Sequence, residues 1–171
     1  MEEELLILVD ENDNEQGTMD KISVHKTGAL HRAFSVFIFT TEFKLLLQQR
    51  SDNKYHSAGL WSNTCCGHPR QGERIIDAVK RRLKEEMGLE CDTVFVFSFI
   101  YRAELNNGLI EHEYDHVYLG VSNSLPVPNA DEVKDWKHIT LAGLRADIDN
   151  NPGHYTEWLK ICLPKVVNFM E

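Results

Sequence analysis

Long hydrophobic runs are absent from this chain of 171 residues, and this excludes a membrane-spanning helix, which needs about 20 apolar residues. The apolar stretch Leu5–Val9 near the N-terminus is short and follows acidic residues, so it is not typical of a signal peptide. Low-complexity segments and internal repeats are also missing. With 42% hydrophobic residues, the composition predicts one compact domain over residues 1–171, cytoplasmic and without a membrane partner.

Positive charge is scarce, because 18 Lys and Arg residues face 27 Asp and Glu residues and the formal net charge is -9. This acidity excludes a nucleic-acid partner, which would require a basic face. Cysteine is scarce as well, and the neighbours Cys65 and Cys66 would form a strained bridge. We therefore expect these two, Cys91 and Cys162 to be reduced thiols.

The most informative segment runs from Gly67 to Leu89, with the sequence G-H-P-R-Q-G-E-R-I-I-D-A-V-K-R-R-L-K-E-E-M-G-L. Its apolar residues recur at helical spacing and predict an amphipathic helix over Glu73–Met87. On the polar side, Arg82, Glu85 and Glu86 fall within one turn, so a phosphate-binding guanidinium lies beside oxygen ligands for a hard divalent metal. The alternative is a solvated helix with i,i+4 charge pairs, which the spaced glycines and Glu73 disfavour.

This segment resembles the Nudix box, whose pattern is G-x-x-x-x-x-E-x-x-x-x-x-x-x-R-E-apolar-x-E-E-x-G-apolar. The positions that fit the pattern are Gly67, Glu73, Arg81, Leu83, Glu85, Glu86, Gly88 and Leu89. Arg82 departs from it, because a guanidinium stands where the box has a metal-binding carboxylate.

A second run, W-S-N-T-C-C-G-H-P over Trp61–Pro69, leads into the box. A hydrolase in which metal-bound water attacks phosphate has no need of a cysteine there, whereas a thiol beside a metal can transfer a proton at carbon. Both runs together are similar to the type 1 isopentenyl diphosphate isomerases. That resemblance implies an α/β fold with a Nudix-type mixed β-sheet sandwiched between helices. It also implies interconversion of isopentenyl and dimethylallyl diphosphate for isoprenoid biosynthesis, with the cysteine before Gly-His-Pro, Cys66, as a catalytic residue.

Two carboxylates at i and i+2, Glu111 and Glu113, point to one face if Leu109–Tyr114 is a strand, and His112 points to the other. The alternative is an ordinary polar strand edge. The family resemblance implies that Glu111 is a metal ligand. It implies that Glu113 is both a metal ligand and the acid–base partner of Cys66, and we expect Tyr101 to give Glu113 a hydrogen bond.

His25 and His31 are expected in a loop before the apolar run 33–39, and His68 lies in the box. Each alone would more often be a surface or hydrogen-bonded residue. Three imidazoles and two carboxylates suit zinc, manganese or another divalent first-row ion. The resemblance implies that all three histidines are ligands of one Mn2+ or Zn2+.

The remaining cations are expected to converge on a small diphosphate; they are Lys21, Arg50, Lys54 and Arg82. The resemblance places a Mg2+ ion, bound together with the substrate diphosphate, on Glu86, and leaves Glu85 facing solvent. We expect Cys65 to pack inward.

Moving a double bond requires a proton at one end of the alkene and its removal two carbons away, through a species close to a tertiary cation. An aromatic face without water favours such a cation. Trp158 matches a family aromatic over the site, and Trp61 is expected to help line it. Trp158 also fits a core stripe with Ile161, Cys162 and Val166, so both interpretations stay open.

Alternation and β-branched or aromatic residues predict strands at Leu5–Val9, Ala33–Thr40, Lys44–Arg50, Thr93–Arg102 and Glu113–Val121. Further helices are predicted near Leu141–Asp147 and over His154–Phe169, where Pro164 should kink or end the helix. The Pro-containing segment Ser122–Ala130 is predicted to be a loop.

The main alternative is a Nudix hydrolase of a nucleoside or other diphosphate, which Arg82, Cys66 and the histidines disfavour. A third possibility is a non-enzymatic metal-dependent binding module on the same fold. The favoured hypothesis is an isomerase that is a monomer or weak dimer and whose partner is a small isoprenoid diphosphate.

Overall fold

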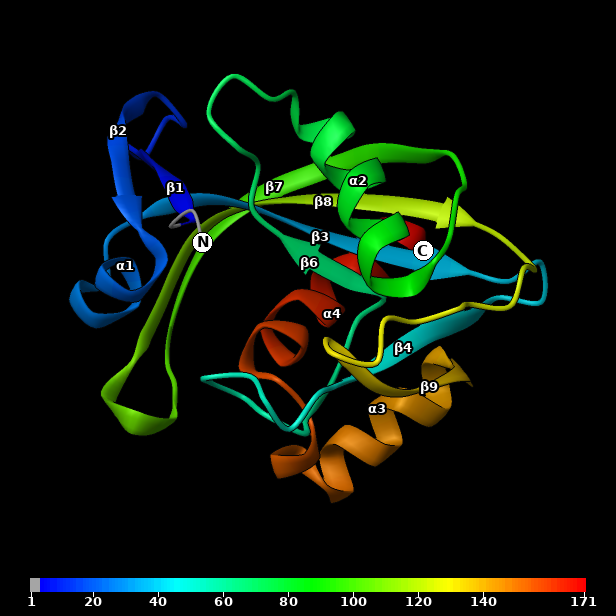
Figure 1. Ribbon diagram of the computed structural model, residues 1–171. Helices are drawn as coiled ribbons and strands as arrows, with labels where there is room; N and C mark the ends of the chain where they lie inside the picture. The colour runs from blue at the N-terminus through cyan, green and yellow to red at the C-terminus, as the bar shows by residue number, and fades with distance from the viewer. Residues whose placement is uncertain (1–3) are drawn as a thin grey trace.

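The computed structural model describes residues 4–171 and shows a curved, nine-stranded mixed β-sheet flanked by helices (Figure 1). The strands are β1 (Leu5–Val9), β2 (Glu15–Asp20), β3 (His31–Phe39), β4 (Lys44–Arg50), β5 (Trp61–Ser62), β6 (Cys65–Gly67), β7 (Thr93–Glu104), β8 (Ile110–Val121) and β9 (Val133–Thr140). The helices are α1 (Lys21–Thr27), α2 (Ile75–Met87), α3 (Leu141–Asn150) and α4 (Glu157–Met170). None of the helices in residues 4–171 is long and apolar enough to cross a membrane.

Strand β3 is the centre of the sheet. Its residues 34–36 pair with antiparallel β6 and also with parallel β8, so these two strands must lie on opposite edges of β3. Strand β7 continues the sheet beyond β8 in antiparallel pairing. In this register Glu113 lies beside His31 on one side and beside Tyr101 on the other, while Ser35 lies beside Cys66.

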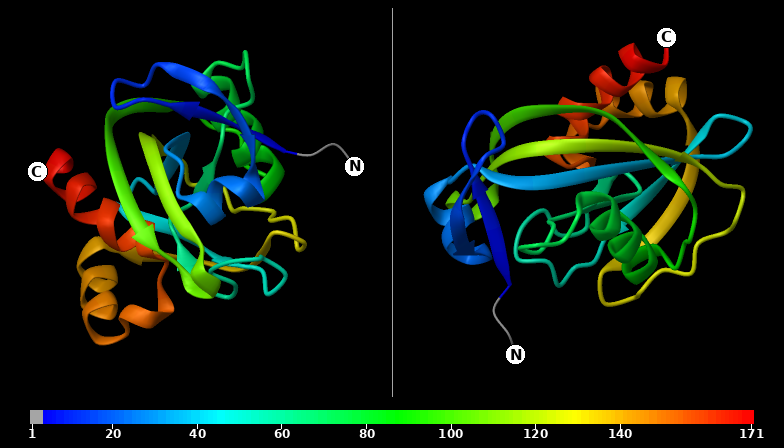
Figure 2. Two further views of the ribbon diagram at one scale, coloured as in Figure 1. Left: turned by 90° about the vertical axis from the view of Figure 1, so that its left-hand side faces the viewer. Right: turned by 90° about the horizontal axis from the view of Figure 1, so that it is seen from above.

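The two faces of the sheet carry two separate cores, because successive strand residues point to opposite sides. Val36 and Ile38 of β3 belong to a buried cluster with Leu83 of α2. Phe37 and Phe39 belong to a second cluster with buried residues of α3 and α4. Figure 2 shows α2 on one side of the sheet and α3 and α4 on the other, which confirms the predicted helix–sheet–helix sandwich.

The segment before β3 differs from the predicted loop. Residues 21–27 form helix α1, so His25 stands on a helix and His31 begins β3. Asp20 caps the helix by accepting a hydrogen bond from Ser23 N, and Gly28 ends it in the left-handed conformation with φ 73°. The helix has only 7 residues, which is too short for apolar periodicity to indicate it.

Four strands, β2, β5, β6 and β9, were not predicted. Within residues 4–171, β2 pairs only with β1 and β9 only with β4, so each is an edge strand with a half-exposed, largely polar sequence. The last helix begins at Glu157, after a 3-10 turn over Pro152–His154, and it continues through Pro164. Pro164 is therefore not a helix boundary.

The predicted loop over residues 122–130 docks on the end of α2. Val127 N donates to Met87 O at 2.9 Å and Asn129 N donates to Glu86 O at 2.9 Å, which satisfies two free carbonyls of the helix end. Gly88 permits this contact, because it has φ 62° and a Cβ there would lie 2.4 Å from Val127 O.

We expect Gly88→Ala to destabilise the fold more than Gly72→Ala, which is a matched control. Gly72 also has a positive φ, 81°, but a Cβ there would meet no atom within 4 Å. The control should lose about 1 kcal/mol of unfolding free energy from backbone strain alone. Gly88→Ala should lose roughly 1–3 kcal/mol more from overpacking against Val127. Urea denaturation of both variants measures this, and equal losses would show that the loop does not press on the helix end.

Candidate active site

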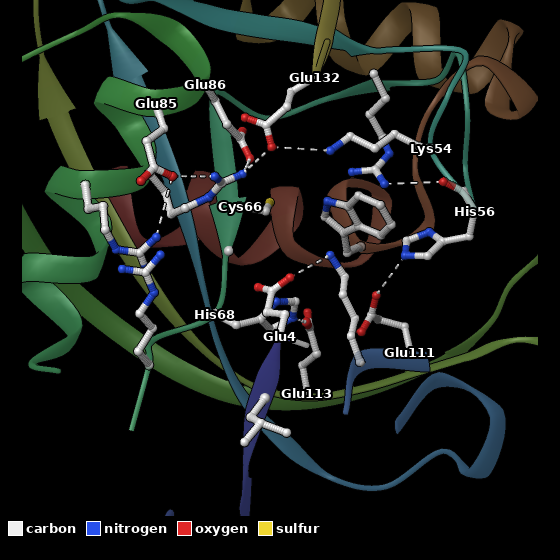
Figure 3. Close-up of a pocket in the computed structure, with 18 of the residues that line it drawn as sticks. Glu4, Lys54, His56, Cys66, His68, Glu85, Glu86, Glu111, Glu113 and Glu132 are labelled. Carbon is white, nitrogen blue, oxygen red and sulfur yellow. Dashed lines mark hydrogen bonds and ion pairs between the residues drawn. The ribbon is translucent and has the colours of Figure 1, made fainter. Parts of the chain in front are cut away.

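A cavity of about 690 Å³ opens where α1, β6, α2, β8 and α4 meet, and charged side chains line most of it (Figure 3). The volume suits a small-molecule ligand. The cavity reaches around strand β6 to both faces of the sheet, because Cys66 lies at its α4 side and Arg82 and Glu86 come from α2.

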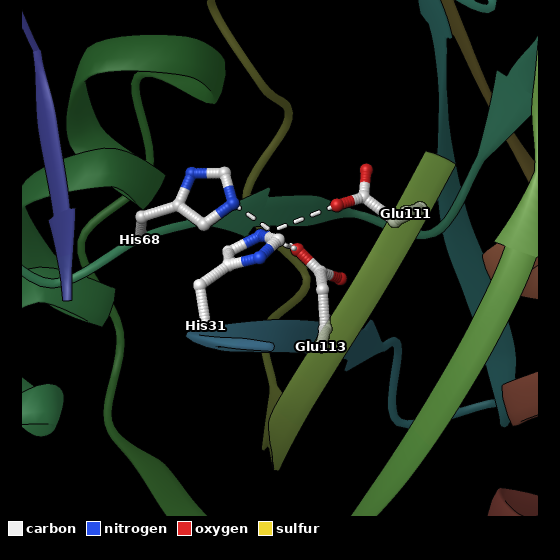
Figure 4. A group of neighbouring side chains, drawn as sticks. All are labelled: His31, His68, Glu111 and Glu113. Atoms are coloured by element: carbon white, nitrogen blue, oxygen red, sulfur yellow. Dashed lines mark hydrogen bonds and ion pairs between the residues drawn. The ribbon is translucent and has the colours of Figure 1, made fainter. Parts of the chain in front are cut away.

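The His/Glu cluster, which we define as His25, His31, His68, Glu111 and Glu113, meets the cavity through His68, Glu111 and Glu113. Nε2 of His31 lies 3.3 Å from a carboxylate oxygen of Glu111 and 3.3 Å from one of Glu113 (Figure 4). His68 Nε2 lies 3.1 Å from Glu113, and His25 Nε2 lies 3.0 Å from Glu111. Four of the five residues that the sequence predicted as ligands of one ion, His31, His68, Glu111 and Glu113, place donor atoms within 4.8 Å of one another, whereas His25 forms a second group with His56 and Glu111.

The hydrogen bonds of His31 test whether this cluster suits a cation. Its Nδ1–H donates to Ala29 O at 3.0 Å, so Nε2 of the neutral ring carries a lone pair. That nitrogen is buried and makes no directed hydrogen bond, although carboxylate oxygens face it. Lone pairs of His31, His68, Glu111 and Glu113 converge within 4.8 Å, a donor set that fits a divalent first-row ion.

The pKa values of His31 and Glu111 also indicate that the cluster favours a bound positive charge. Burial by itself lowers the pKa of His31, but pairing with Glu111 and Glu113 outweighs burial and raises it to about 10. Burial raises the pKa of Glu111, but its histidine partners His25 and His31 bring it below its usual range. The apoprotein therefore draws a proton into the place where a metal ion would neutralise the carboxylates.

His56 is a member of the site that the sequence did not indicate. It is 5% exposed, and its Nε2 lies 3.8 Å from Glu111. Burial, followed by the charges of Arg50 and His25, lowers its pKa to about 2, so the ring is neutral. A single histidine in the loop between β4 and β5 carries no ligand spacing, and only the fold reveals its position.

The acid–base candidates are a thiol and a carboxylate that differ in protonation. Cys66 is partly exposed to the cavity; burial and then the charge of Asp115 raise the pKa of its thiol, which keeps its proton. For Glu113, burial and the charge of Glu111 oppose ionisation, but pairing with His31 and His68 lowers the pKa below its usual value. The Tyr101 hydroxyl donates a hydrogen bond to Glu113.

The four predicted cations all line the cavity, and three of them already have acidic partners. Arg82 lies 2.5 Å from Glu86 and 2.7 Å from Glu132. Lys54 lies 3.6 Å from Glu132, and Lys21 lies 3.6 Å from Glu4. Neither Glu4 nor Glu132 was predicted, because isolated acidic residues in an acidic chain give no signal.

Arg50 is held differently, between backbone and an aromatic ring. Its Nη2 donates to His56 O at 3.3 Å, and the guanidinium lies 5.0 Å from the centre of the Trp158 ring. Burial lowers the pKa of Arg50 from its usual value.

The predicted metal residue of the box helix, Glu86, is 6% exposed and faces the cavity. One oxygen accepts from Gln48 Nε2 at 2.8 Å and the other contacts Arg82. Glu85 also lines the cavity but is exposed, as expected, and Cys65 is buried in the core beneath α2.

The two predicted tryptophans have different positions. Trp158 lines the cavity, is 5% exposed and packs with Tyr101. Trp61 packs against the second core cluster, with Lys137 Nζ 4.4 Å from its ring centre, and is not among the cavity-lining residues. The prediction that Trp61 helps to line the site is thus corrected: adjacent residues of β5 point to opposite sides, and Ser62 is the one that meets Trp158.

Comparisons with known proteins agree with this geometry. Residues 29–159 match the NUDIX domain. The chain is 53% identical to isopentenyl-diphosphate Delta-isomerase 1 of Aromatoleum aromaticum, over 96% of this chain and 93% of that protein. It is 52% identical to isopentenyl-diphosphate Delta-isomerase 2 of Photorhabdus laumondii, over 97% of this chain and 92% of that protein.

Among solved structures, the fold is similar to that of DR0079 from Deinococcus radiodurans, with a TM-score of 0.79 at 19% identity, covering 95% of this chain and 98% of that one. At that identity the likeness shows the fold alone, and the sequence matches supply the rest. On the strength of those matches along nearly its whole length, the chain belongs to the isopentenyl-diphosphate Delta-isomerases of the NUDIX-domain family.

Proposed function

We propose that this enzyme interconverts isopentenyl diphosphate and dimethylallyl diphosphate, with Cys66 and Glu113 as its acid–base pair. The observation that carries the proposal is that a thiol and a carboxylate, Cys66 and Glu113, line one cavity. Burial raises the pKa of the thiol, whereas pairing with His31 and His68 outweighs burial and lowers the pKa of the Glu113 carboxyl. Isomerisation needs one proton given and one taken, so such a pair needs no further proton source. The names of the relatives support the same reaction.

The strand arrangement suits transfer at two different carbons. Cys66 stands on β6 and Glu113 on β8, and these strands lie on opposite edges of β3. An alkene seated between them meets the thiol from one side and the carboxylate from the other. The Cys66 S–H adds its proton to the terminal carbon, and Glu113 removes one two carbons away.

The wall between these groups is aromatic and mostly buried. Tyr101 and Trp158 pack together with Cys66 at their edge. The faces of these rings favour a developing positive charge at carbon, and their bulk excludes water that would capture it. This supports the interpretation of Trp158 as a site residue, while its contact with Ile161 gives it a packing role as well.

Arg82, Lys54, Lys21 and Arg50, which line the cavity, would hold the diphosphate. Glu86 would carry a Mg2+ ion that binds together with the diphosphate. The His/Glu cluster would hold one Mn2+ or Zn2+. Bound there, a divalent ion supplies positive charge that keeps Glu111 and Glu113 ionised.

The partner proposed for the site is therefore a small isoprenoid diphosphate. A cytoplasmic location, the monomeric or weakly dimeric state and the absence of a nucleic-acid partner stay predictions from composition. The hydrolase alternative has no specific observation in its favour, because the guanidinium of Arg82 occupies the place where the Nudix box has a further carboxylate.

The first test compares Cys66→Ala with Cys65→Ala. Cys65 is the neighbouring thiol, but it points into the core beneath α2. Cys66→Ala should lower the isomerisation rate by about 10²–10⁴-fold, because a proton donor is lost while the diphosphate contacts remain. NMR in deuterated water, following the alkene and phosphorus signals of isopentenyl diphosphate, measures this. Cys65→Ala should stay within about threefold of the unaltered enzyme.

Near-normal turnover by Cys66→Ala would refute the role of the thiol. Release of inorganic phosphate by the unaltered enzyme would instead support the hydrolase, and in that case the deuterium content of the alkene would not change.

A second test concerns the diphosphate site. Arg82→Glu should weaken binding of inorganic pyrophosphate with Mg2+ by about tenfold or more, because it replaces a cation with a charge that repels the ligand. Arg74→Glu is the control, since Arg74 precedes the first residue of α2, is exposed and, within residues 4–171, forms an ion pair only with Asp77. Calorimetric titration should show an unchanged affinity for the control. Equal affinities for both variants would remove Arg82 from the diphosphate site.

A third test removes one ligand of the His/Glu cluster. His31→Ala should lower the affinity for Zn2+ or Mn2+ by at least about 10–100-fold, because a buried nitrogen ligand is lost. His112→Ala is the control, since that histidine points to the other face of β8 and contacts Gly28 O. Metal content after dialysis against a graded chelator measures the difference. A stoichiometric ion retained by His31→Ala would place the metal elsewhere.

A further inference from the structure

A chain of buried hydrogen bonds connects the tryptophan of the cavity to the thiol. Trp158 Nε1 donates to Ser62 Oγ at 2.9 Å, and Ser62 Oγ donates to Asn63 Oδ1 at 3.0 Å. The Cys66 thiol donates to the same amide oxygen at 3.2 Å. Ser62 is 3% exposed and Asn63 is 1% exposed, so water does not compete for these bonds.

The direction of every bond in this chain is determined by chemistry. An indole N–H only donates, so Ser62 must accept from Trp158. Ser62 also accepts from Thr156 Oγ1 at 3.2 Å, which leaves its one hydrogen for Asn63. The capacity of the Ser62 hydroxyl, one donor and two acceptor positions, is then fully used.

The side-chain amide of Asn63 cannot be flipped to place its NH2 group, instead of its oxygen, next to the sulfur. Its Nδ2 donates to Val36 O at 3.1 Å and to Cys65 O at 2.9 Å, and both partners are carbonyls that only accept. Its Oδ1 is therefore directed at the Cys66 thiol. These bonds also tie Asn63 to β3 and β6, so the acceptor is as rigid as the sheet.

The Cys66 sulfur has a second polar neighbour, the hydroxyl of Ser35. Ser35 Oγ lies 3.7 Å from Cys66 Sγ and donates its own hydrogen to Asp115 Oδ2 at 2.7 Å. The single S–H hydrogen is accepted by Asn63 Oδ1, so Ser35 Oγ is a second fixed polar neighbour of the sulfur and not a second acceptor.

Resting on the isomerase function proposed above, we infer that Ser62 and Asn63 are positioning residues that hold the Cys66 sulfur in register with the indole of Trp158. Both ends of the chain meet the alkene, the indole through its ring face and the sulfur through its proton. A substrate carbon seated on the ring then lies at a constant distance from the thiol, which is the geometry that rapid proton transfer requires.

The experiment compares Ser62→Ala with Ser62→Thr, which keeps the hydroxyl. In Ser62→Ala, kcat for isopentenyl diphosphate should fall about 10–100-fold with KM within about twofold, since the diphosphate contacts are untouched. Ser62→Thr should restore kcat to within about threefold. In a Trp158→Phe background, where the first donor is already missing, adding Ser62→Ala should change kcat by less than about threefold.

A second readout does not depend on turnover. The infrared S–H stretching band of Cys66, assigned by its loss in Cys66→Ala, should shift in Ser62→Ala and in Trp158→Phe, because the hydrogen bond on Asn63 Oδ1 changes. If Ser62→Ala does not fold, Trp158→Phe carries this test alone. An enzyme without isomerase activity whose S–H band still shifts would refute the proposed function but retain the hydrogen-bonded chain.

Two results would overturn the inference. One is a folded Ser62→Ala variant with an unshifted S–H band and unchanged kcat. The other is a rise in KM at constant kcat, which would make Ser62 a contributor to substrate binding rather than to thiol position.

Discussion

The pairing of short strand β6 with the edge of β3 is the constraint on which the rest of the site depends. Side chains alternate along β6, so Cys66 faces α4 and the aromatic wall, while Cys65 and Gly67 face α2. A Cβ at Gly67 would lie 2.7 Å from Phe34 and 3.2 Å from Arg82, so only glycine lets the helix come this close. One strand of three residues thereby places the Cys66 thiol on one face of the sheet and lets Arg82 of α2 approach the other.

The electrostatic cost of this site is concentrated in the His/Glu cluster. Glu111 and Glu113 are 4% and 8% exposed, and two buried carboxylates this close repel each other. Histidines surround them, and pairing with Glu111 and Glu113 outweighs burial and raises the pKa of His31. A divalent ion bound there would supply twice the charge of a proton, and its binding would then be coupled to the stability of β8 and α1.

Much of the architecture could be predicted because the central strands are strongly patterned. Strands β1, β3, β4, β7 and β8 and helix α2 follow apolar periodicity, and the box motif predicted the sandwich and the family. Helix α1 and edge strands β2 and β9 were missed, because caps and single-sided pairing stabilise them rather than amphipathic pattern. Strands β5 and β6 were also missed, because two or three residues are too few for alternation to indicate a strand.

The residues of the candidate site also fall into those that the sequence predicted and those that it did not. Residues with motif spacing, such as Cys66 and His68, were placed in the cavity as predicted, although their catalytic and metal-binding roles stay predictions. His56, Glu132 and Ser62 could not be predicted, because each enters the site through a contact distant in sequence. Trp61 was misplaced for a related reason: adjacent residues of an unpredicted two-residue strand point in opposite directions.

The ion pairs already present in the cavity have a consequence for how it responds to salt. Arg82 and Lys54 share Glu132, and Lys21 faces Glu4, so these cations are neutralised before any ligand arrives. A diphosphate that binds these cations would displace protein carboxylates from them instead of free counterions. Because few mobile ions are released in such an exchange, ionic strength would affect affinity less than for the same cations standing unpaired.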